Sequence, residues 1–336
     1  MGSQPNVFVT GGTGFLGHSL LPLLVEKGYH VRALTRYPEH YPWLNDLGVE
    51  AIKGDVEDRH VIDCAVEGCD YVVHAAGRFS FWGKREQFEH TNVQGAANVM
   101  DAAVRMNVKK FVHISTIVVV GSPLPDQIID ETHPTNPVEP YQRSKLKGEK
   151  LALQHWQDHQ LPVVILRPGA FYGPHGRYAF NRLFIEDPLK GLLIQVNGGH
   201  YVTFPVYIGD VAATILNALQ QGTPGEIYNV CGETITHQAA NDIVSEEAGI
   251  THFRLNIPAW SMIALASAWT ALSEYTHIEP YYPLNLRSYV FNNWRISSDK
   301  AHRDLSFEPI PFREGVRRTL DWYVEAGIWK PRHKRS

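Results

Sequence analysis

The chain has 336 residues, of which 44% are hydrophobic and 20% are charged, and it carries a formal net charge of -4. This is the composition of a globular protein large enough for one main hydrophobic core and a second, smaller one. The slight acidity gives no reason to expect a nucleic-acid partner, and no apolar run reaches the roughly 18 residues of a transmembrane helix.

The three cysteines, Cys64, Cys69 and Cys231, are odd in number and lack C-x-x-C spacing. This pattern argues against a disulfide framework and against a zinc site, so no metal is expected. Residues 1–6 lack the basic and apolar regions of a signal peptide. We therefore expect a cytoplasmic protein, with residues 331–336 forming a solvated basic tail.

The N-terminal stretch, residues 7–17, reads Val-Phe-Val-Thr-Gly-Gly-Thr-Gly-Phe-Leu-Gly. Its first three residues suit a buried strand, and an apolar pattern of helical period runs on from Phe15. Between them Gly11, Gly14 and Gly17 permit a tight turn and let a pyrophosphate approach the backbone. The N-terminus of the following helix offers free N–H groups to that pyrophosphate. This context predicts a dinucleotide-binding site.

Strands then alternate with helices along the first half of the chain. Such alternation implies an α/β fold with a right-handed, doubly wound parallel sheet of the Rossmann type. We expect strands at residues 7–9, 30–35, 49–53, 70–74, 109–115 and 162–166, and helices at 15–28, 58–68 with Asp58 as its cap, 87–107 and 141–159.

The second half of the chain is less regular. The apolar helix expected at residues 258–275 is too short to span a membrane, and core packing is favoured over a lid or a membrane contact. Residues 1–168 and about 204–232 should form the dinucleotide-binding domain, and about 169–203 and 233–330 a smaller, partly helical substrate domain. The other expected elements are helices at 180–192, 210–220, 235–248 and 312–327 and a strand at 226–230.

Tyr141 and Lys145 are four residues apart in an expected helix, so their side chains share one face, one turn apart. A cation beside a phenol lowers its pKa and makes it a better proton-transfer group. Taken alone, such a pair is more often a surface pair. The catalytic interpretation is favoured because Ser115 and Thr116 end a predicted parallel strand, where ligands bind such sheets.

In combination these motifs resemble those of the extended short-chain dehydrogenase/reductase family, within the NAD-dependent epimerase/dehydratase superfamily. The similarity covers nearly the whole chain. It rests on residues 10–17, 54–55, 74–77, 92–95, 113–116, 121, 141–145, 167–174, 298–301 and 315–322.

The resemblance implies a catalytic hydroxyl, tyrosine and lysine, which here are Thr116, Tyr141 and Lys145. Thr116 is chosen over Ser115 because it stands five residues before Gly121, as the family's hydroxyl does. In the implied mechanism Thr116 binds the substrate oxygen and Tyr141 transfers its proton, while Lys145 holds the nicotinamide ribose and lowers the pKa of Tyr141. The other implied cofactor-binding residues are Gly11, Thr13, Gly14, Phe15, Leu16, Gly17, Asp55, Val56, Ala75, Ala76, Gly77 and Pro168.

The end of the second predicted strand indicates which dinucleotide binds. NAD-binding proteins of this kind place an acidic residue there for the ribose hydroxyl, but this chain has Thr35 followed by Arg36, with Arg32 inside the strand. An arginine can pair with a 2′-phosphate, so Arg36 favours NADP(H) over NAD(H), with Asp55 on the adenine side. The alternative for Arg36 is a solvent-facing residue at a strand end.

Within the family, residues 31–36 and the aromatic loop 79–82 are most similar to dihydroflavonol-reductase-like and 3β-hydroxysteroid-dehydrogenase-like members. The similarity implies an NADP(H)-dependent carbonyl reductase or alcohol dehydrogenase for a bulky apolar small molecule. Five aromatic residues are candidates to line its pocket, with packing of the interdomain core as the alternative for each: Phe79, Phe81, Trp82, Phe171 and Tyr172.

Other functions stay open on sequence grounds. A nucleotide-sugar epimerase with tightly held NAD is disfavoured by the missing acid near Thr35. A dehydratase is disfavoured by Ile117 and Val118, which replace the acidic pair that those relatives carry after the catalytic hydroxyl. A non-catalytic NADP-sensing protein would not need the proton donor that Tyr141 supplies.

Two further expectations concern the predicted helices. Family analogy implies a homodimer formed through the helices near residues 87–107 and 141–159. His155 and His159 have a spacing that can bind metal, but no H-E-x-x-H pattern accompanies them. We interpret both as surface residues.

Overall fold

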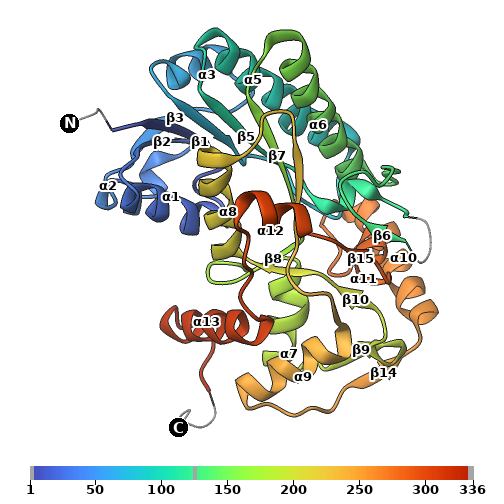
Figure 1. Ribbon diagram of the computed structural model, residues 1–336. Helices are drawn as coiled ribbons and strands as arrows, with labels where there is room; N and C mark the ends of the chain where they lie inside the picture. Colours follow the sequence, from blue (N-terminus) through green and yellow to red (C-terminus); the bar gives the residue numbers. More distant parts are fainter. Residues whose placement is uncertain (1–3, 124–126, 332–336) are drawn as a thin grey trace.

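The computed structural model describes residues 4–123 and 127–331 (Figure 1). A seven-stranded sheet lies at its centre, and every pair of neighbouring strands in it is parallel. The strand order, β12-β7-β5-β4-β1-β2-β3, reverses direction between β1 and β4, and confirms the predicted Rossmann fold. The strands are β1 (Asn6–Thr10), β2 (His30–Thr35), β3 (Glu50–Lys53), β4 (Tyr71–His74), β5 (Lys110–Ile114), β7 (Val163–Pro168) and β12 (Ile227–Val230).

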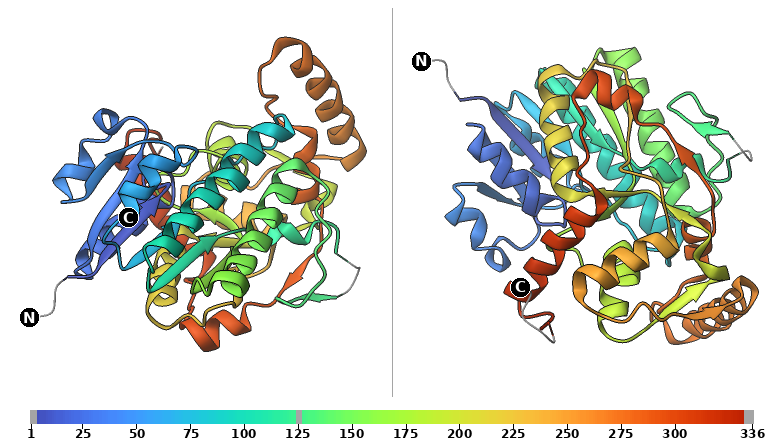
Figure 2. Two further views of the ribbon diagram at one scale, coloured as in Figure 1. Left: turned by 90° about the horizontal axis from the view of Figure 1, so that it is seen from above. Right: turned by 60° about the horizontal axis from the view of Figure 1, so that its bottom comes forward.

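Alternate residues of β1 face opposite sides of the sheet, as the two-residue period of a strand requires. Val7 and Val9 pack in one hydrophobic cluster with α1 (Gly17–Glu26) and α8 (Ile208–Gln221). Phe8 packs in a second cluster with α3 (Arg59–Val66), α5 (Ala96–Arg105) and α6 (Pro140–His159). Helices therefore cover both faces of the sheet (Figures 1 and 2).

Two local features of the first half of the chain are a helix cap that the sequence predicts and a helix interruption that it does not. Asp58 caps α3 as predicted, since its Oδ1 accepts the N–H of His60 at 3.1 Å. The helix predicted at 87–107 is interrupted: a π-helical turn, η2 (His90–Gly95), joins α4 (Arg85–Glu89) to α5. The wider turn places Asn92 in the protein interior.

The second half builds a smaller core from η4 (Asn181–Glu186), α9 (His237–Ala248) and α13 (Phe312–Glu325), with α7 (Asp187–Leu189) after η4. Four short strand pairs were not predicted, because strands of two or three residues carry no detectable period. They are β8 (Ala170–Tyr172) with β11 (Pro205–Tyr207), β9 (Ile194–Val196) with β14 (Leu255–Ile257), β10 (Val202–Thr203) with β13 (Ile235–Thr236), and β6 (Ile128–Ile129) with β15 (Arg295–Ile296). The remaining short helices are η1 (Pro38–His40), α2 (Trp43–Asp46), η3 (Ile117–Val120), η5 (Asn197–Gly199), η6 (Leu284–Leu286) and α11 (Arg287–Val290).

One segment packs in a different place from the one predicted. Ala301 and Leu305 of α12 (Asp299–Leu305), together with Phe307, belong to the cluster of the main sheet and lie against α8 and β12. The segment lies within residues 233–330, which were assigned to the substrate domain, so that boundary is wrong here. A four-residue spacing gives α12 one apolar face, and that face covers the end of the sheet. Of the predicted basic tail, residues 332–336 lie outside the described residues.

The apolar helix α10 (Ala259–Thr276) is not the core helix that the sequence predicts. It projects from the body of the molecule (Figure 2), and only Ala266 and Ser273 are buried. Trp260 and Tyr275 are 72% and 86% exposed. Apolar residues surround the whole helix, so packing one face leaves the others in solvent. Within the described residues, no helix combines the length and the apolar character needed to cross a membrane.

A buried ion pair ties α6 to the sheet. Nε and Nη2 of Arg167, in β7, donate to the two carboxylate oxygens of Glu149, in α6, at 2.9 and 2.7 Å. The two side chains are 4% and 2% exposed. Partners buried in this way satisfy one another, whereas removal of one leaves a charge without a counter-charge in the interior. The pair fixes the helix that carries Tyr141 and Lys145.

Arg167→Met should lower the free energy of unfolding by about 3–5 kcal/mol, because the buried Glu149 carboxylate then loses both of its hydrogen bonds from Arg167. Adding Glu149→Leu should recover most of this loss. Lys147→Met is the matched control on the same helix, because its ion pair with Glu89 is exposed and should matter little. Urea denaturation followed by circular dichroism measures all three variants. A double variant no more stable than Arg167→Met would contradict the explanation.

Candidate active site

The turn between β1 and α1 lets a ligand approach its backbone closely. Gly11 has a φ of +74°, and a Cβ there would lie 2.7 Å from the backbone carbon of Ala75. A Cβ at Gly17 would lie 1.8 Å from the carbonyl oxygen of Gly12, so only glycine lets the helix begin this close to the turn. Leu16, the N-cap of α1, makes no side-chain hydrogen bond to the helix N-terminus. The turn therefore fits the pyrophosphate of a dinucleotide.

The catalytic cavity, as we name it, has a volume of about 410 Å³ and lies where the carboxyl ends of β1, β4, β5 and β7 meet. This edge is the switch point of the sheet, where open α/β folds bind their ligands. The predicted cofactor-binding residues Thr13, Gly17, Arg36, Asp55 and Val56 lie outside its lining. The predicted residues that line it are Gly11, Gly14, Phe15, Leu16, Ala75, Ala76, Gly77, Thr116, Tyr141, Lys145 and Pro168.

The structure brings the three predicted catalytic side chains into this cavity. Thr116, just beyond β5, forms a hydrogen bond with the phenol of Tyr141. Lys145 Nζ donates to the carbonyl oxygen of Ile114, the last residue of β5, at 2.6 Å. Ser115 also lines the cavity, but its Oγ is buried with no hydrogen-bond partner in the described part of the chain. Contact with the phenol therefore distinguishes Thr116 from Ser115.

Burial controls the protonation of these groups. It raises the pKa of Tyr141 well above its usual value, and the hydrogen bond from Thr116 lowers that pKa by less. Burial also lowers the pKa of Lys145 to about 8, an effect that the Glu149 carboxylate opposes. The phenol is therefore protonated at neutral pH, and the lowering of its pKa by Lys145 stays a prediction.

Two histidines beside Lys145 are held neutral. Burial, and then the charge of Lys145, lowers the pKa of His74 to about 3 and that of His113 well below its usual value. His74 Nδ1 and the Thr10 hydroxyl are hydrogen-bonded at 2.8 Å, and the same hydroxyl accepts the N–H of Ala76 at 3.1 Å. These bonds fix the loop after β4 against the glycine turn.

Asn92, in the π-helical turn, is a positioning residue to which the sequence analysis assigned no role. Its Nδ2 donates to Ser144 Oγ at 2.9 Å and to the carbonyl of Arg78 at 3.1 Å, while its Oδ1 accepts the N–H of Arg78 at 2.7 Å. Ser144 in turn donates to the carbonyl of Tyr141 at 2.7 Å. Asn92 thereby ties the loop after β4 to α6. Its only sequence signal was its place in the motif 92–95.

Aromatic side chains form much of the wall. Phe79, Phe81 and Phe171 line the cavity as predicted, and the ring of Phe79 lies 4.9 Å from that of Tyr141. Tyr172 does not line the cavity. Successive residues of β8 point to opposite sides, and the side chain of Tyr172 is buried in the smaller core. Trp82 also lies outside the lining, in a turn closed by the Ser80 hydroxyl. The lining that sequence reasoning missed includes Tyr178, Phe180, Phe204 and Tyr289.

Arg36 and Asp55 form an exposed pair beyond the end of β2, with Arg36 Nε 3.8 Å from Asp55 Oδ2. Arg32, by contrast, is used structurally: its Nε donates to Glu50 at 2.9 Å and its Nη1 to the carbonyl of Glu67 at 2.6 Å. Of the two arginines near this strand end, only Arg36 is therefore free to meet a ligand.

No group of His, Cys, Asp and Glu side chains among the described residues could hold a metal ion. His155 is not the surface residue that its helical position suggested. It is buried, and its Nε2 lies 3.0 Å from the Asp101 carboxylate in α5. It is therefore part of the contact between α5 and α6.

The family model "NAD dependent epimerase/dehydratase family" matches residues 7–231 of this chain. A 4-hydroxy-2-methyl-3-oxo-4-farnesyl-3,4-dihydroquinoline-1-oxide ketoreductase of Stigmatella aurantiaca is 31% identical, over 89% of this chain and 91% of its own. A dTDP-D-glucose 4,6-dehydratase of Mus musculus is 29% identical, over 94% and 88%. A putative dihydroflavonol 4-reductase of Synechocystis is 27% identical, over 96% of each chain.

Solved structures show the same fold. The crystal structure of gox2253 superposes with a TM-score of 0.82 at 26% identity and covers 97% of this chain and 100% of its own. A double mutant of DesIV from Streptomyces venezuelae, a dTDP-glucose 4,6-dehydratase with NAD bound, gives a TM-score of 0.78 at 25% identity, over 97% of this chain and 99% of its own. The family uses nicotinamide cofactors, and its signature turn, its sheet and its Tyr–Lys helix are all present here. This chain therefore belongs to the NAD-dependent epimerase/dehydratase family, among the extended short-chain dehydrogenases/reductases.

Proposed function

We propose that this protein is an NADP(H)-dependent oxidoreductase that interconverts a ketone or aldehyde and an alcohol on an apolar small molecule. The observation that carries the proposal is the lining of the catalytic cavity. Thr116 and Tyr141 lie there among apolar and aromatic side chains, including Phe79, Phe81 and Phe171. Such a cavity favours an apolar substrate whose reacting oxygen is its main polar atom. The ketoreductase relative supports this class of reaction.

The residues of the chain act on the substrate oxygen and on the cofactor's position. The dinucleotide, when bound at the glycine turn, supplies the hydride chemistry. Tyr141, kept protonated by burial, donates a proton to the oxygen as that atom gains negative charge. Thr116 donates a hydrogen bond to the same oxygen. Lys145 holds the ribose, and Gly11, Thr13, Gly14, Phe15, Leu16, Gly17, Val56, Ala75, Ala76, Gly77 and Pro168 would form the rest of the cofactor cradle.

The cavity is less suited to a nucleotide sugar, the substrate class named for several relatives. Arg177 lines the cavity, but its Nη2 donates to the Glu186 carboxylate at 3.1 Å. Its positive charge is therefore already paired. Ile117 and Val118, which replace the acidic pair of the dehydratases, are both buried in an apolar cluster. These features favour a reductase over an epimerase or a dehydratase.

We also propose NADP(H) over NAD(H), a homodimer and a cytoplasmic location. Arg36 supports the cofactor choice, because it is exposed beyond β2 and no acidic residue stands at the strand end. The dimer would use α5 and α6, which lie side by side on one face of the sheet (Figure 1). Free Cys64, Cys69 and Cys231 are compatible with a reducing compartment.

The direct test is a screen of ketones, aldehydes, sterols and UDP-sugars, followed by absorbance at the nicotinamide band. Turnover of a ketone or aldehyde with net consumption of NADPH supports the proposal. Interconversion of a UDP-sugar without net cofactor change would replace it with the epimerase.

Tyr141→Phe should lower kcat by about 10²–10⁴-fold, because a positioned proton donor is lost, and should leave NADP(H) binding nearly unchanged. Thr116→Ala should lower kcat by a smaller factor, since it removes one hydrogen bond to the reacting oxygen. Steady-state kinetics on the substrate found in the screen measure both. Ser115→Ala is the matched control; if it is damaging and Thr116→Ala harmless, Ser115 is the catalytic hydroxyl.

Lys145→Met should lower kcat but stabilise the fold. Its folded-state pKa of about 8 lies below the usual 10.5, so the unfolded chain binds more protons between these values. Below pH 8 the buried ammonium therefore costs stability, and its removal should add about 1–3 kcal/mol to the free energy of unfolding. This gain should shrink as the pH rises toward 10.5. Denaturation at several pH values measures this effect, with Lys147→Met as the control. A Lys145→Met variant less stable than the wild type would show that burial does not lower the pKa of Lys145.

Arg36→Ala should weaken NADPH binding about tenfold and leave NADH binding almost unchanged. A charge-assisted hydrogen bond contributes about 1.5–3 kcal/mol, and the exposed position of Arg36 argues for the lower value. Thr35→Asp added to Arg36→Ala should reverse the preference, because it provides a partner for the ribose hydroxyl and repels the phosphate. Titration of both cofactors at fixed ionic strength measures the effect; an equal loss for both would rule out phosphate recognition by Arg36.

A further inference from the structure

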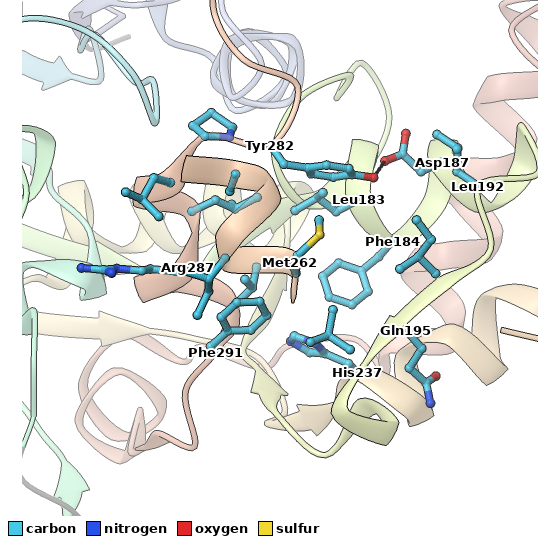
Figure 3. A pocket seen from close by; sticks show the side chains of 18 of the residues that line it. Leu183, Phe184, Asp187, Leu192, Gln195, His237, Met262, Tyr282, Arg287 and Phe291 are labelled. Atoms are coloured by element: carbon cyan, nitrogen blue, oxygen red, sulfur yellow. Dashed lines mark hydrogen bonds between the residues drawn. The ribbon is translucent and has the colours of Figure 1, made fainter. Parts of the chain in front are cut away.

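A second cavity of about 110 Å³ lies between α10 and the smaller core. Figure 3 looks into it and shows side chains from α10, η4 and α11 converging on one space. We call it the distal pocket; it is lined by residues that include Leu183, Phe184, His237, Met262, Leu286 and Val290. Most of its lining is apolar, and the proposed function does not use it.

The distal pocket shares a wall with the catalytic cavity. Leu183 and Phe184 of η4, Leu286 of η6 and Val290 of α11 line both spaces. Only apolar side chains are shared, and side-chain rotamer changes on ligand binding are common. A ligand too long for the catalytic cavity can therefore extend between these side chains without leaving apolar surroundings.

His237 adds a polar group to this apolar pocket. It is 8% exposed, and its Nε2 is buried with no hydrogen-bond partner in the described part of the chain. Its ring also forms a hydrogen bond to the backbone of Val202, and burial lowers its pKa to about 4, so the imidazole is neutral at neutral pH. With one ring nitrogen donating to that backbone, Nε2 is left as an acceptor. The pocket thus offers one acceptor to a ligand that carries a donor.

We propose that the distal pocket is a second subsite, which takes the far end of a long apolar carbonyl substrate and accepts a hydrogen bond from a hydroxyl on that end through His237. The inference rests on the proposed function, because it assumes that the reacting carbonyl lies at Tyr141. It extends that function by naming the shape of the substrate: a reacting oxygen at one end, an apolar body, and a donor at the other. α10 contributes Met262, Ile263 and Ala266 to the subsite, so the helix forms its outer wall.

The test compares methyl ketones of increasing length, from butanone through octanone to dodecanone, in wild type, Met262→Trp and Ala266→Phe. Each methylene buried in the subsite should raise kcat/KM up to about three- to fourfold in the wild type. Both variants fill the distal pocket and should lose this gain while keeping the turnover of butanone. Leu265→Trp is the matched control, since Leu265 is an exposed residue of the same helix that lies outside the lining.

A terminal hydroxyl tests the role of His237. Dodecanone carrying a hydroxyl on its last carbon should be turned over about as well as dodecanone by the wild type. His237→Leu should turn over the hydroxylated ketone at least about tenfold less well and the parent ketone equally well, because a buried hydroxyl is then left unpaired. Equal kinetics of the two ketones in His237→Leu would overturn the assignment of the acceptor.

Calorimetric titration with dodecanone separates this inference from the proposed function. If the wild type reduces no ketone, the proposed function fails, and the titration decides the pocket by itself. Weaker binding to Met262→Trp and Ala266→Phe than to wild type and Leu265→Trp supports the subsite. If Met262→Trp and Ala266→Phe keep the rise of kcat/KM with ketone length, or bind dodecanone as tightly as the wild type, the subsite proposal is overturned.

Discussion

The ammonium of Lys145, buried at the end of β5, is the constraint on which the arrangement of the site depends. Its Nζ donates to the backbone carbonyl of Ile114 at 2.6 Å, and the Glu149 carboxylate is near enough to favour its charge. Burial first, and then this cation, lowers the pKa values of His74 and His113, so both rings are neutral. The same burial keeps Tyr141 protonated. The site thus places a proton donor and the Lys145 ammonium in the same cavity.

Holding that charge requires rigid surroundings. The Arg167–Glu149 pair fixes α6 to β7, and Asn92 fixes it to the loop after β4. Asn92 lies in the π-helical turn η2, which directs it into the interior. The irregular part of this helix therefore helps to hold α6 in place. Parallel strands place all of these contacts at one edge of the sheet, beside the glycine turn between β1 and α1.

Apolar surface dominates the rest of the site. The catalytic cavity and the distal pocket share an apolar wall, and α10 covers the latter while exposing Trp260 and Leu272 to solvent. This apolar lining is the feature that supports the proposed apolar substrate. The farnesyl ketoreductase of Stigmatella aurantiaca, a relative in the same family, supports the same proposal.

The sequence by itself determined the sheet, the glycine turn and the Tyr141–Lys145 helix, because strand and helix periods and fixed motif spacings are local properties of the chain. Three matters were decided only by tertiary structure. The pKa of Tyr141 depends on burial, which outweighs the hydrogen bond with Thr116. Tyr172 and Phe171 point to opposite sides of one short strand, which no pattern foretold. The exposure of α10 depends on how much of the helix its neighbours cover. Its apolar residues are spread around the whole helix, so the sequence does not specify which face packs against the protein.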